Sequence, residues 1–153
     1  MDKEEKLGRA DKYGSDALEA LKTATKPNPQ MPDDQWNELK KEYVARAHQA
    51  LGLSAMVRKK WDVAITEFKT AVDGSAKPDP ATQVRLASAY DAAGKYDEAL
   101  VILDKLMTQS DLHPSIRQFA QAERVRAMQG KGTVKPATPP AAPAAAPGET
   151  KKP

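Results

Sequence analysis

The stretch Val84–Leu106, VRLASAYDAAGKYDEALVILDKL, decides the fold of this chain. Two runs with helical spacing of apolar side chains flank Gly94, and glycine readily takes the left-handed conformation that ends a helix. A connection this short predicts two antiparallel helices packed on one another. Their apolar stripes are Leu86, Ala87 and Tyr90 before the glycine, and Tyr96, Ala99, Leu103 and Leu106 after it.

The same pattern occurs once more upstream, in residues 51–71, LGLSAMVRKKWDVAITEFKTA. Trp61 precedes Tyr96 by 35 residues, and Phe68 precedes Leu103 by the same number. An aromatic, a small and a large side chain at positions i, i+3 and i+7 lie on one stripe of a helix. Because a repeated helix pair buries its apolar face only against its neighbours, the sequence predicts an array of such pairs.

Along the rest of the body, apolar residues recur at helical spacing, and glycines and prolines separate these segments. This pattern predicts helices and no strands, and therefore an all-α fold of antiparallel helix pairs. Asp79 with Pro80 and His113 with Pro114 are typical helix starts, and Asp33 is a further expected N-cap. We expect Trp36, Trp61 and Phe119 on inward stripes. The expected helices cover residues 3–24, 32–58, 61–72, 79–94, 96–107 and 113–130.

These two units resemble the tetratricopeptide repeat (TPR) family, in particular its bacterial members. Leu86, Ala87, Tyr90, Gly94, Tyr96, Ala99 and Leu103 stand at the signature positions of the second unit, and Leu51, Gly52, Trp61, Ala64, Phe68 and Ala71 at those of the first. Ala55 and Lys59 depart from the pattern, since the family usually has an aromatic residue and a turn glycine there. The resemblance implies a right-handed solenoid whose concave face receives a peptide.

The first helix resembles the second helix of an earlier repeat, because Ala17, Leu21 and Ala24 have its small, large, small spacing. A repeat that lacks its partner leaves an apolar face uncovered. Either the chain is the C-terminal part of a longer repeat protein, or this helix folds back as a cap. Self-association through the exposed first helix is a further option.

The last 23 residues, from Lys131 to Pro153, are rich in alanine and proline and offer no large apolar side chain. Such a segment cannot offset its ordering entropy by burial, so we expect a folded domain over residues 1–130 and a disordered tail over 131–153. The four lysines of the tail, less the charge of Glu149, account for the whole formal net charge of +3. The neutral body therefore predicts no nucleic-acid partner.

The sequence predicts no enzyme, no metal and no cofactor. There is no cysteine, and neither His48 nor His113 has a histidine or carboxylate at metal-ligand spacing. No apolar run is long enough to span a membrane, and no export signal is visible. As written, the chain is expected in the cytoplasm, and in the periplasm or outside the cell if an upstream export signal is missing from it.

By resemblance, the first helix of each pair lines the binding groove. The residues carried over to that groove are Gln49, Leu53, Met56, Arg85, Ser88, Asp91, Glu123 and Arg126. The competing interpretation is that Leu53 and Met56 pack against the next helix pair. Two hypotheses of function follow: a scaffold that binds a peptide or protein segment in this groove, and an architectural C-terminal segment of a longer solenoid with no site of its own.

Overall fold

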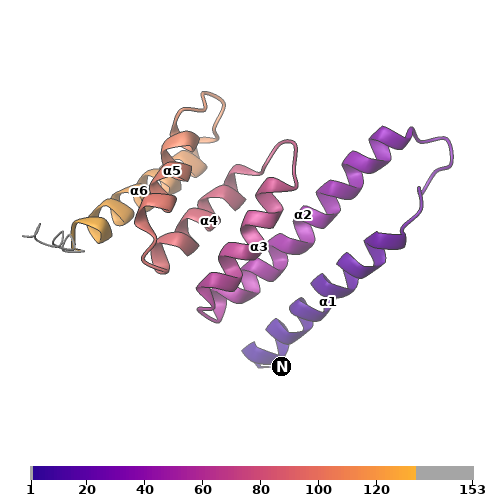
Figure 1. Ribbon diagram of the computed structural model, residues 1–153, viewed down its shortest axis with the longest axis horizontal. Helices are drawn as coiled ribbons and strands as arrows, with labels where there is room; N and C mark the ends of the chain where they lie inside the picture. The colour runs from indigo at the N-terminus through magenta and orange to yellow at the C-terminus, as the bar shows by residue number, and fades with distance from the viewer. Residues whose placement is uncertain (1, 134–153) are drawn as a thin grey trace, which may run out of the picture.

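Helices follow one another in a single row along the described part of the chain, residues 2–133 of the computed structural model, which contains no strand (Figure 1). Each helix packs on its neighbours in the chain, and α6 packs on α4 as well. The all-α prediction is therefore confirmed. The helices are α1 (Lys3–Thr23), α2 (Asp33–Val57), α3 (Trp61–Asp73), α4 (Pro80–Ala92), α5 (Tyr96–Met107) and α6 (Pro114–Thr133).

Local chemistry explains most of these bounds. The Asp79 carboxylate accepts hydrogen bonds from the backbone N–H groups of Ala81 and Thr82, and so caps α4 immediately before Pro80. Gly94 has a φ of 74° in the turn between α4 and α5. Lys59, 35 positions earlier, has a φ of 59° in the corresponding turn between α2 and α3. The turns of the two units thus share a left-handed residue, although only one of them is glycine.

The predicted cap at Asp33 is wrong. Pro32 occupies the N-cap position of α2 and offers no side-chain acceptor, while Asp33 is the first helical residue. Its carboxylate instead accepts a hydrogen bond from Lys26 Nζ at 2.6 Å. Lys26 lowers the pKa of Asp33 through this hydrogen bond and its positive charge. The carboxylate in the first turn still interacts favourably with the helix dipole.

Two clusters of buried side chains form the core, and α4 contributes to both. Phe68 is fully buried in the cluster of α2, α3 and α4, and Leu103 is fully buried in the cluster of α4, α5 and α6. Tyr90 and Ile102 pack against both clusters. At Gly52 an added Cβ would lie 2.8 Å from the Phe68 ring, so only glycine lets α2 approach α3 this closely.

The first helix is attached more loosely, since Gly14 is its only buried residue. An added Cβ at Gly14 would lie 2.8 Å from Leu51 Cδ2, so α1 and α2 are in close contact there. Arg58, just after α2, binds the other end of α1. Its guanidinium donates to Glu4 Oε1 at 2.6 Å and to Asp11 Oδ2 at 2.8 Å.

Three aromatic residues lie closer to the surface than predicted. Trp36 and Trp61 are only half-buried, and Phe119 is 64% exposed. The two tryptophans are thus partly covered, whereas Phe119 lies on the open surface of α6. The C-terminal boundary also differs, because α6 continues through residues 131–133, and Lys131 pairs with Asp97 of α5 at 2.5 Å. The predicted disordered tail otherwise lies outside the described residues.

Candidate interaction face on α2, α4 and α6

The residues assigned to the groove lie on α2, α4 and α6, the first helices of the successive pairs. Because α4 and α6 pack directly on one another, their groove residues come close together in space. Arg85, Ser88 and Asp91 of α4 and Glu123 of α6 are all half-buried, and Arg126 is exposed. Side chains at this level of burial can still be reached by a ligand.

A cluster of charged side chains joins α4 to α6. Arg126 Nη1 donates to Glu123 Oε1 at 2.6 Å, and the Glu123 side chain is only 14% exposed. Burial raises the pKa of Asp91 above its ordinary value, the Glu123 carboxylate raises it further, and Arg126 lowers it. The charges of these three groups therefore interact across the α4–α6 contact.

Two oxygens of this cluster lack partners. Asp91 Oδ1 and Glu123 Oε2 are buried, and neither accepts a hydrogen bond from the part of the chain that the structure describes. A buried acceptor without a partner costs about 1 to 3 kcal/mol, and buried polar atoms in folded proteins are rarely left in this state.

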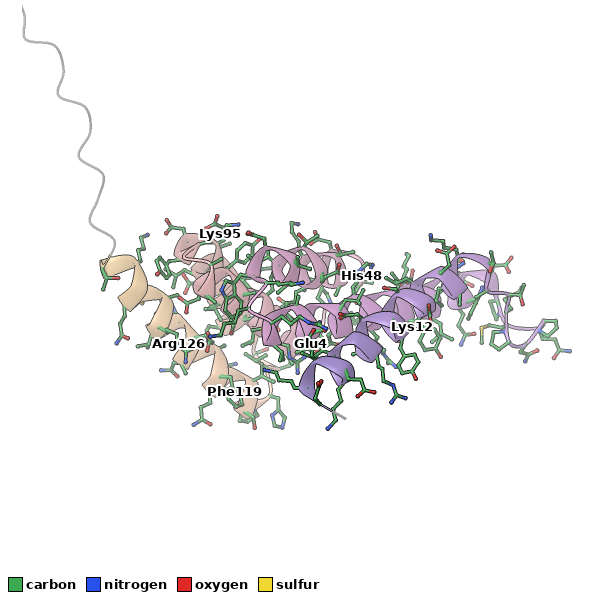
Figure 2. The ribbon with its side chains drawn as sticks, turned by 90° about the horizontal axis from the view of Figure 1, so that it is seen from below. Glu4, Lys12, His48, Lys95, Phe119 and Arg126 are labelled. Atoms are coloured by element: carbon green, nitrogen blue, oxygen red, sulfur yellow. The ribbon has the colours of Figure 1, made fainter. Side chains whose placement is uncertain are left out.

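Beside this cluster α6 presents an exposed aromatic residue. Phe119 and Arg126 are seven residues apart and lie on the same side of α6 (Figure 2). Arg85 of α4 precedes Phe119 by 34 residues. The Arg85 guanidinium makes no ion pair within residues 2–133. This part of the face thus offers a cation, an aromatic ring and carboxylate acceptors.

The three residues predicted on α2 lie in three different environments. Leu53 is 39% exposed and belongs to the open surface, as does its neighbour Val57 at 46%. Met56 packs against the core cluster of α2, α3 and α4. Gln49 lines a hollow of 220 Å³ between α2 and the turn that leads from α3 to α4.

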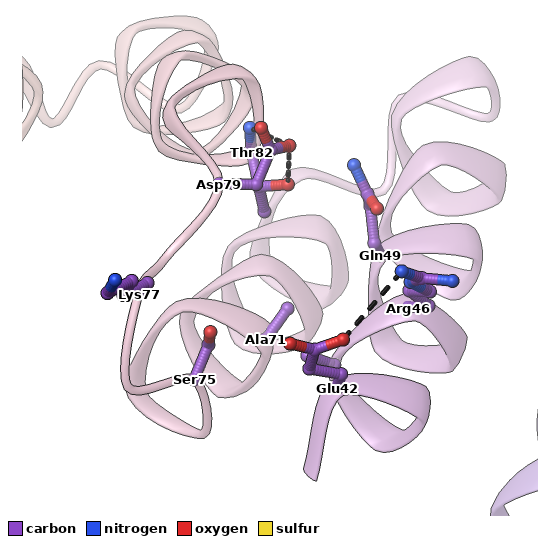
Figure 3. A pocket seen from close by; sticks show the side chains of 9 residues that line it. Glu42, Arg46, Gln49, Ala71, Ser75, Lys77, Asp79 and Thr82 are labelled. Carbon is purple, nitrogen blue, oxygen red and sulfur yellow. Dashed lines mark hydrogen bonds and ion pairs between the residues drawn. The ribbon is translucent and has the colours of Figure 1, made fainter. Parts of the chain in front are cut away.

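Figure 3 shows that polar groups line this hollow. Arg46 Nη2 lies 3.8 Å from Glu42 Oε2 on the α2 side. On the opposite side Thr82 Oγ1 donates to Asp79 Oδ2 at 2.8 Å. These groups are already engaged in an ion pair and in the cap of α4, so the hollow has a structural role.

The two histidines of the described chain each have one hydrogen-bonding partner. His48 Nδ1 lies 2.7 Å from Glu67 Oε2 and links α2 to α3, while His113 Nδ1 accepts a hydrogen bond from the backbone N–H of Ser115 at the start of α6. Within residues 2–133 no group of three or more histidine, aspartate or glutamate side chains could hold a metal ion. None of the helices described is both long and apolar enough to cross a membrane.

Compared with models of known families, with curated proteins and with solved structures, the chain matches none of them.

The sequence interpretation missed Phe119 as a surface residue, although a signal for it was present. Phe119 follows Arg85 by 34 residues, the interval that separates Pro80 from Pro114. Extending the period into α6 would have placed Phe119 at the position equivalent to Arg85. The orphaned oxygens of Asp91 and Glu123 carry no such signal, because their burial depends on how α4 and α6 approach one another.

Proposed function

We propose that the protein is a non-catalytic scaffold of the tetratricopeptide type, whose α2–α4–α6 face binds a segment of another protein. The fold supports this proposal because helices in chain order, with two equivalent left-handed turns 35 residues apart, are what a helix-pair array requires. Arrays of this kind expose an extended surface suited to binding.

The observation that carries the proposal is the charged cluster of Asp91, Glu123 and Arg126 beside the exposed ring of Phe119. A basic side chain of the ligand near these carboxylates compensates their negative charge. The exposed ring of Phe119 lies on the same helix as Glu123 and offers apolar contact to a neighbouring side chain. The preferred ligand is therefore a segment with a lysine or arginine close to an apolar residue.

The test is selection of peptides from a random display library on the immobilised full chain. Recovered sequences should share a basic residue next to an apolar one. Phe119→Ser and Glu123→Gln should each weaken binding of a recovered peptide by about tenfold or more, since residues at the centre of an interface carry most of its energy. Val101→Ser is the matched control, because Val101 is 70% exposed on α5.

The architectural alternative draws on a different observation, the loose attachment of α1, where Gly14 is the only buried residue. A terminal segment of a longer solenoid would have such a helix next to its missing neighbour. If library selection recovers no peptide, this alternative is favoured. If Val101→Ser weakens binding as much as Phe119→Ser, the chain binds a peptide but the interaction face is misassigned.

A further inference from the structure

A basic hollow lies at the edge of the row where α2 leads into α3 and α4 leads into α5, two turns that lie on the same edge (Figure 1). The hollow has a volume of 720 Å³, and we call it the turn hollow. Three lysines and one aspartate are the charged residues that line it, namely Lys59, Lys60, Lys95 and Asp62. A hollow with an excess of one charge attracts ligands of the opposite charge.

The lysines of the turn hollow are available to a ligand. Lys59 and Lys60 are exposed, and neither makes an ion pair within residues 2–133. Lys95 Nζ lies 3.1 Å from Asp62 Oδ1, and 87% of the Asp62 side chain is exposed. An ion pair between exposed side chains contributes little stability, so Lys95 can exchange this carboxylate for one of a ligand at little cost.

The turn hollow also has an apolar wall. Trp61 and Val63 of α3 line it on one side, and Ala92 and Ala93 line it where α4 ends. Trp61 is half-buried, and Val63 is 48% exposed. A ligand can therefore bury apolar surface here in addition to pairing its charges with the lysines.

The second unit shows how the aromatic residue at this position accepts a peptide segment. Tyr96 follows Trp61 by 35 residues, and a Cβ added to Gly130 of α6 would lie 2.3 Å from the Tyr96 ring. The backbone of α6 therefore packs directly on that ring. In the first unit α4 already ends at Ala92, and the turn hollow lies beside Trp61. The first unit thus has room for a segment that residues 2–133 do not supply.

We propose that the turn hollow binds an acidic segment of a partner protein, with carboxylates on the lysines and an apolar side chain against Trp61 and Val63. The neighbouring charges favour a short segment over an extended polyanion. Asp97 and Glu98, in the first turn of α5, directly follow Lys95 and are exposed. They would repel a nucleic acid or an anionic membrane that extends beyond the hollow.

This site is distinct from the α2–α4–α6 face. Asp91, Glu123 and Arg126 do not line the turn hollow. The two sites also favour ligands of opposite charge, so neither depends on the other. A protein with both sites holds two partner segments at once, one basic and one acidic.

The fluorescence of Trp61 provides a direct test, because the chain has only one other tryptophan. In the full chain with Trp36→Phe, Trp61 is the sole tryptophan, and a synthetic peptide in which glutamates flank a leucine is titrated at low ionic strength. We expect a saturable change in emission, and about tenfold weaker binding when glutamine replaces glutamate in the peptide. Added salt should weaken binding of the glutamate peptide, because it screens the charges.

Neutralising the lysines locates the site. Lys59→Gln and Lys60→Gln should each weaken binding of the glutamate peptide by about threefold, and together by about tenfold, since an exposed ion pair contributes little on its own. Lys105→Gln is the matched control, because Lys105 is exposed at the other end of α5 from Lys95 and makes no ion pair within residues 2–133. Its binding should equal that of the parent.

Three results would overturn the inference: no change in Trp61 emission, equal affinity for the glutamate and glutamine peptides, or equal effects of Lys60→Gln and Lys105→Gln. Tighter binding of single-stranded RNA or of phosphatidylserine vesicles than of the peptide would overturn it as well, since the hollow would then be a general site for polyanions. None of these results bears on the α2–α4–α6 face, because its probes are basic peptides.

Discussion

At the scale of single residues, the raised pKa of Asp91 makes the interaction face accessible to measurement. Its pKa is raised, so over the interval between its ordinary pKa and its pKa in the fold the folded protein binds more protons than the unfolded chain. Asp91 therefore reduces stability as the pH rises through that interval, and the penalty persists at neutral pH. The penalty disappears when the pH falls below the ordinary pKa.

We therefore expect Asp91→Asn to raise the thermal midpoint at neutral pH and to raise it progressively less as the solution is acidified. The amide carries no charge, and its N–H groups can donate to the orphaned oxygen of Glu123. Melting curves at several pH values measure the difference. Asp111→Asn, at an exposed position, should leave the midpoint unchanged throughout, and an Asp91→Asn variant that behaves the same way would show that Asp91 is not destabilised in the fold.

The two left-handed turn residues provide a matched pair of predictions at the residue scale. A residue with a Cβ costs about 1 kcal/mol or more in this conformation, whereas glycine does not incur that cost. Lys59→Gly should therefore stabilise the protein by about 1 kcal/mol, and Gly94→Ala should destabilise it by a similar amount. Urea unfolding of the two variants measures both changes, and changes of the same sign would mean that the turns are not equivalent.

At the scale of elements, α1 packs chiefly on α2, and its two glycines differ in role. Gly8 has no atom within 4 Å of an added Cβ, whereas Gly14 has Leu51 Cγ at 2.9 Å. Replacing a helical glycine by alanine favours the helix by about 0.5 to 1 kcal/mol in both cases. Only at Gly14 does the new methyl group push α1 away from α2.

Gly8→Ala should therefore slow amide hydrogen exchange along α1, whereas Gly14→Ala should speed it up despite the same gain in helix propensity. Exchange in α4, α5 and α6 should change little in either variant, since neither glycine contacts these helices. Slower exchange of α1 in Gly14→Ala would show that Leu51 moves aside and that the contact is not tight.

The sequence predicted where helices begin and end better than it predicted which of their side chains are buried. Helix starts and ends followed from Asp79, Pro80 and Gly94, because capping and turn chemistry act within a few residues. The exposure of Phe119 did not follow, since an apolar stripe indicates which side of a helix faces inward and not whether another helix covers it. Contacts such as Arg58 with Glu4, 54 residues apart, arise from helix packing and have no local signal.

The candidate face was predictable in part for the same reason. The resemblance to tetratricopeptide repeats placed Asp91, Glu123 and Arg126 on first helices of successive pairs, and the structure brings these three together. The period alone could not separate Met56, which packs in the core, from Leu53, which is exposed. That difference depends on the distance between neighbouring helices.

At the scale of the whole molecule, the two core clusters lie side by side and share α4. The main contacts of each helix are with its neighbours in the chain, and α6 also packs on α4, so stability is distributed along the row. Phe68 and Leu103 are fully buried at equivalent positions of the two units, one in each cluster. Truncating them tests whether the clusters unfold together.

Phe68→Ala should cost about 3 to 5 kcal/mol and Leu103→Ala about 2 to 5 kcal/mol, out of a total of about 5 to 15 kcal/mol for a domain of this kind. Because contacts are local, hydrogen exchange should rise most in α2 and α3 for Phe68→Ala, and most in α5 and α6 for Leu103→Ala. The shared helix α4 should lose protection in both variants, since Tyr90 packs against both clusters. Uniform loss of protection in either variant would mean that the row behaves as one cooperative unit, and the description as stacked helix pairs would then fail.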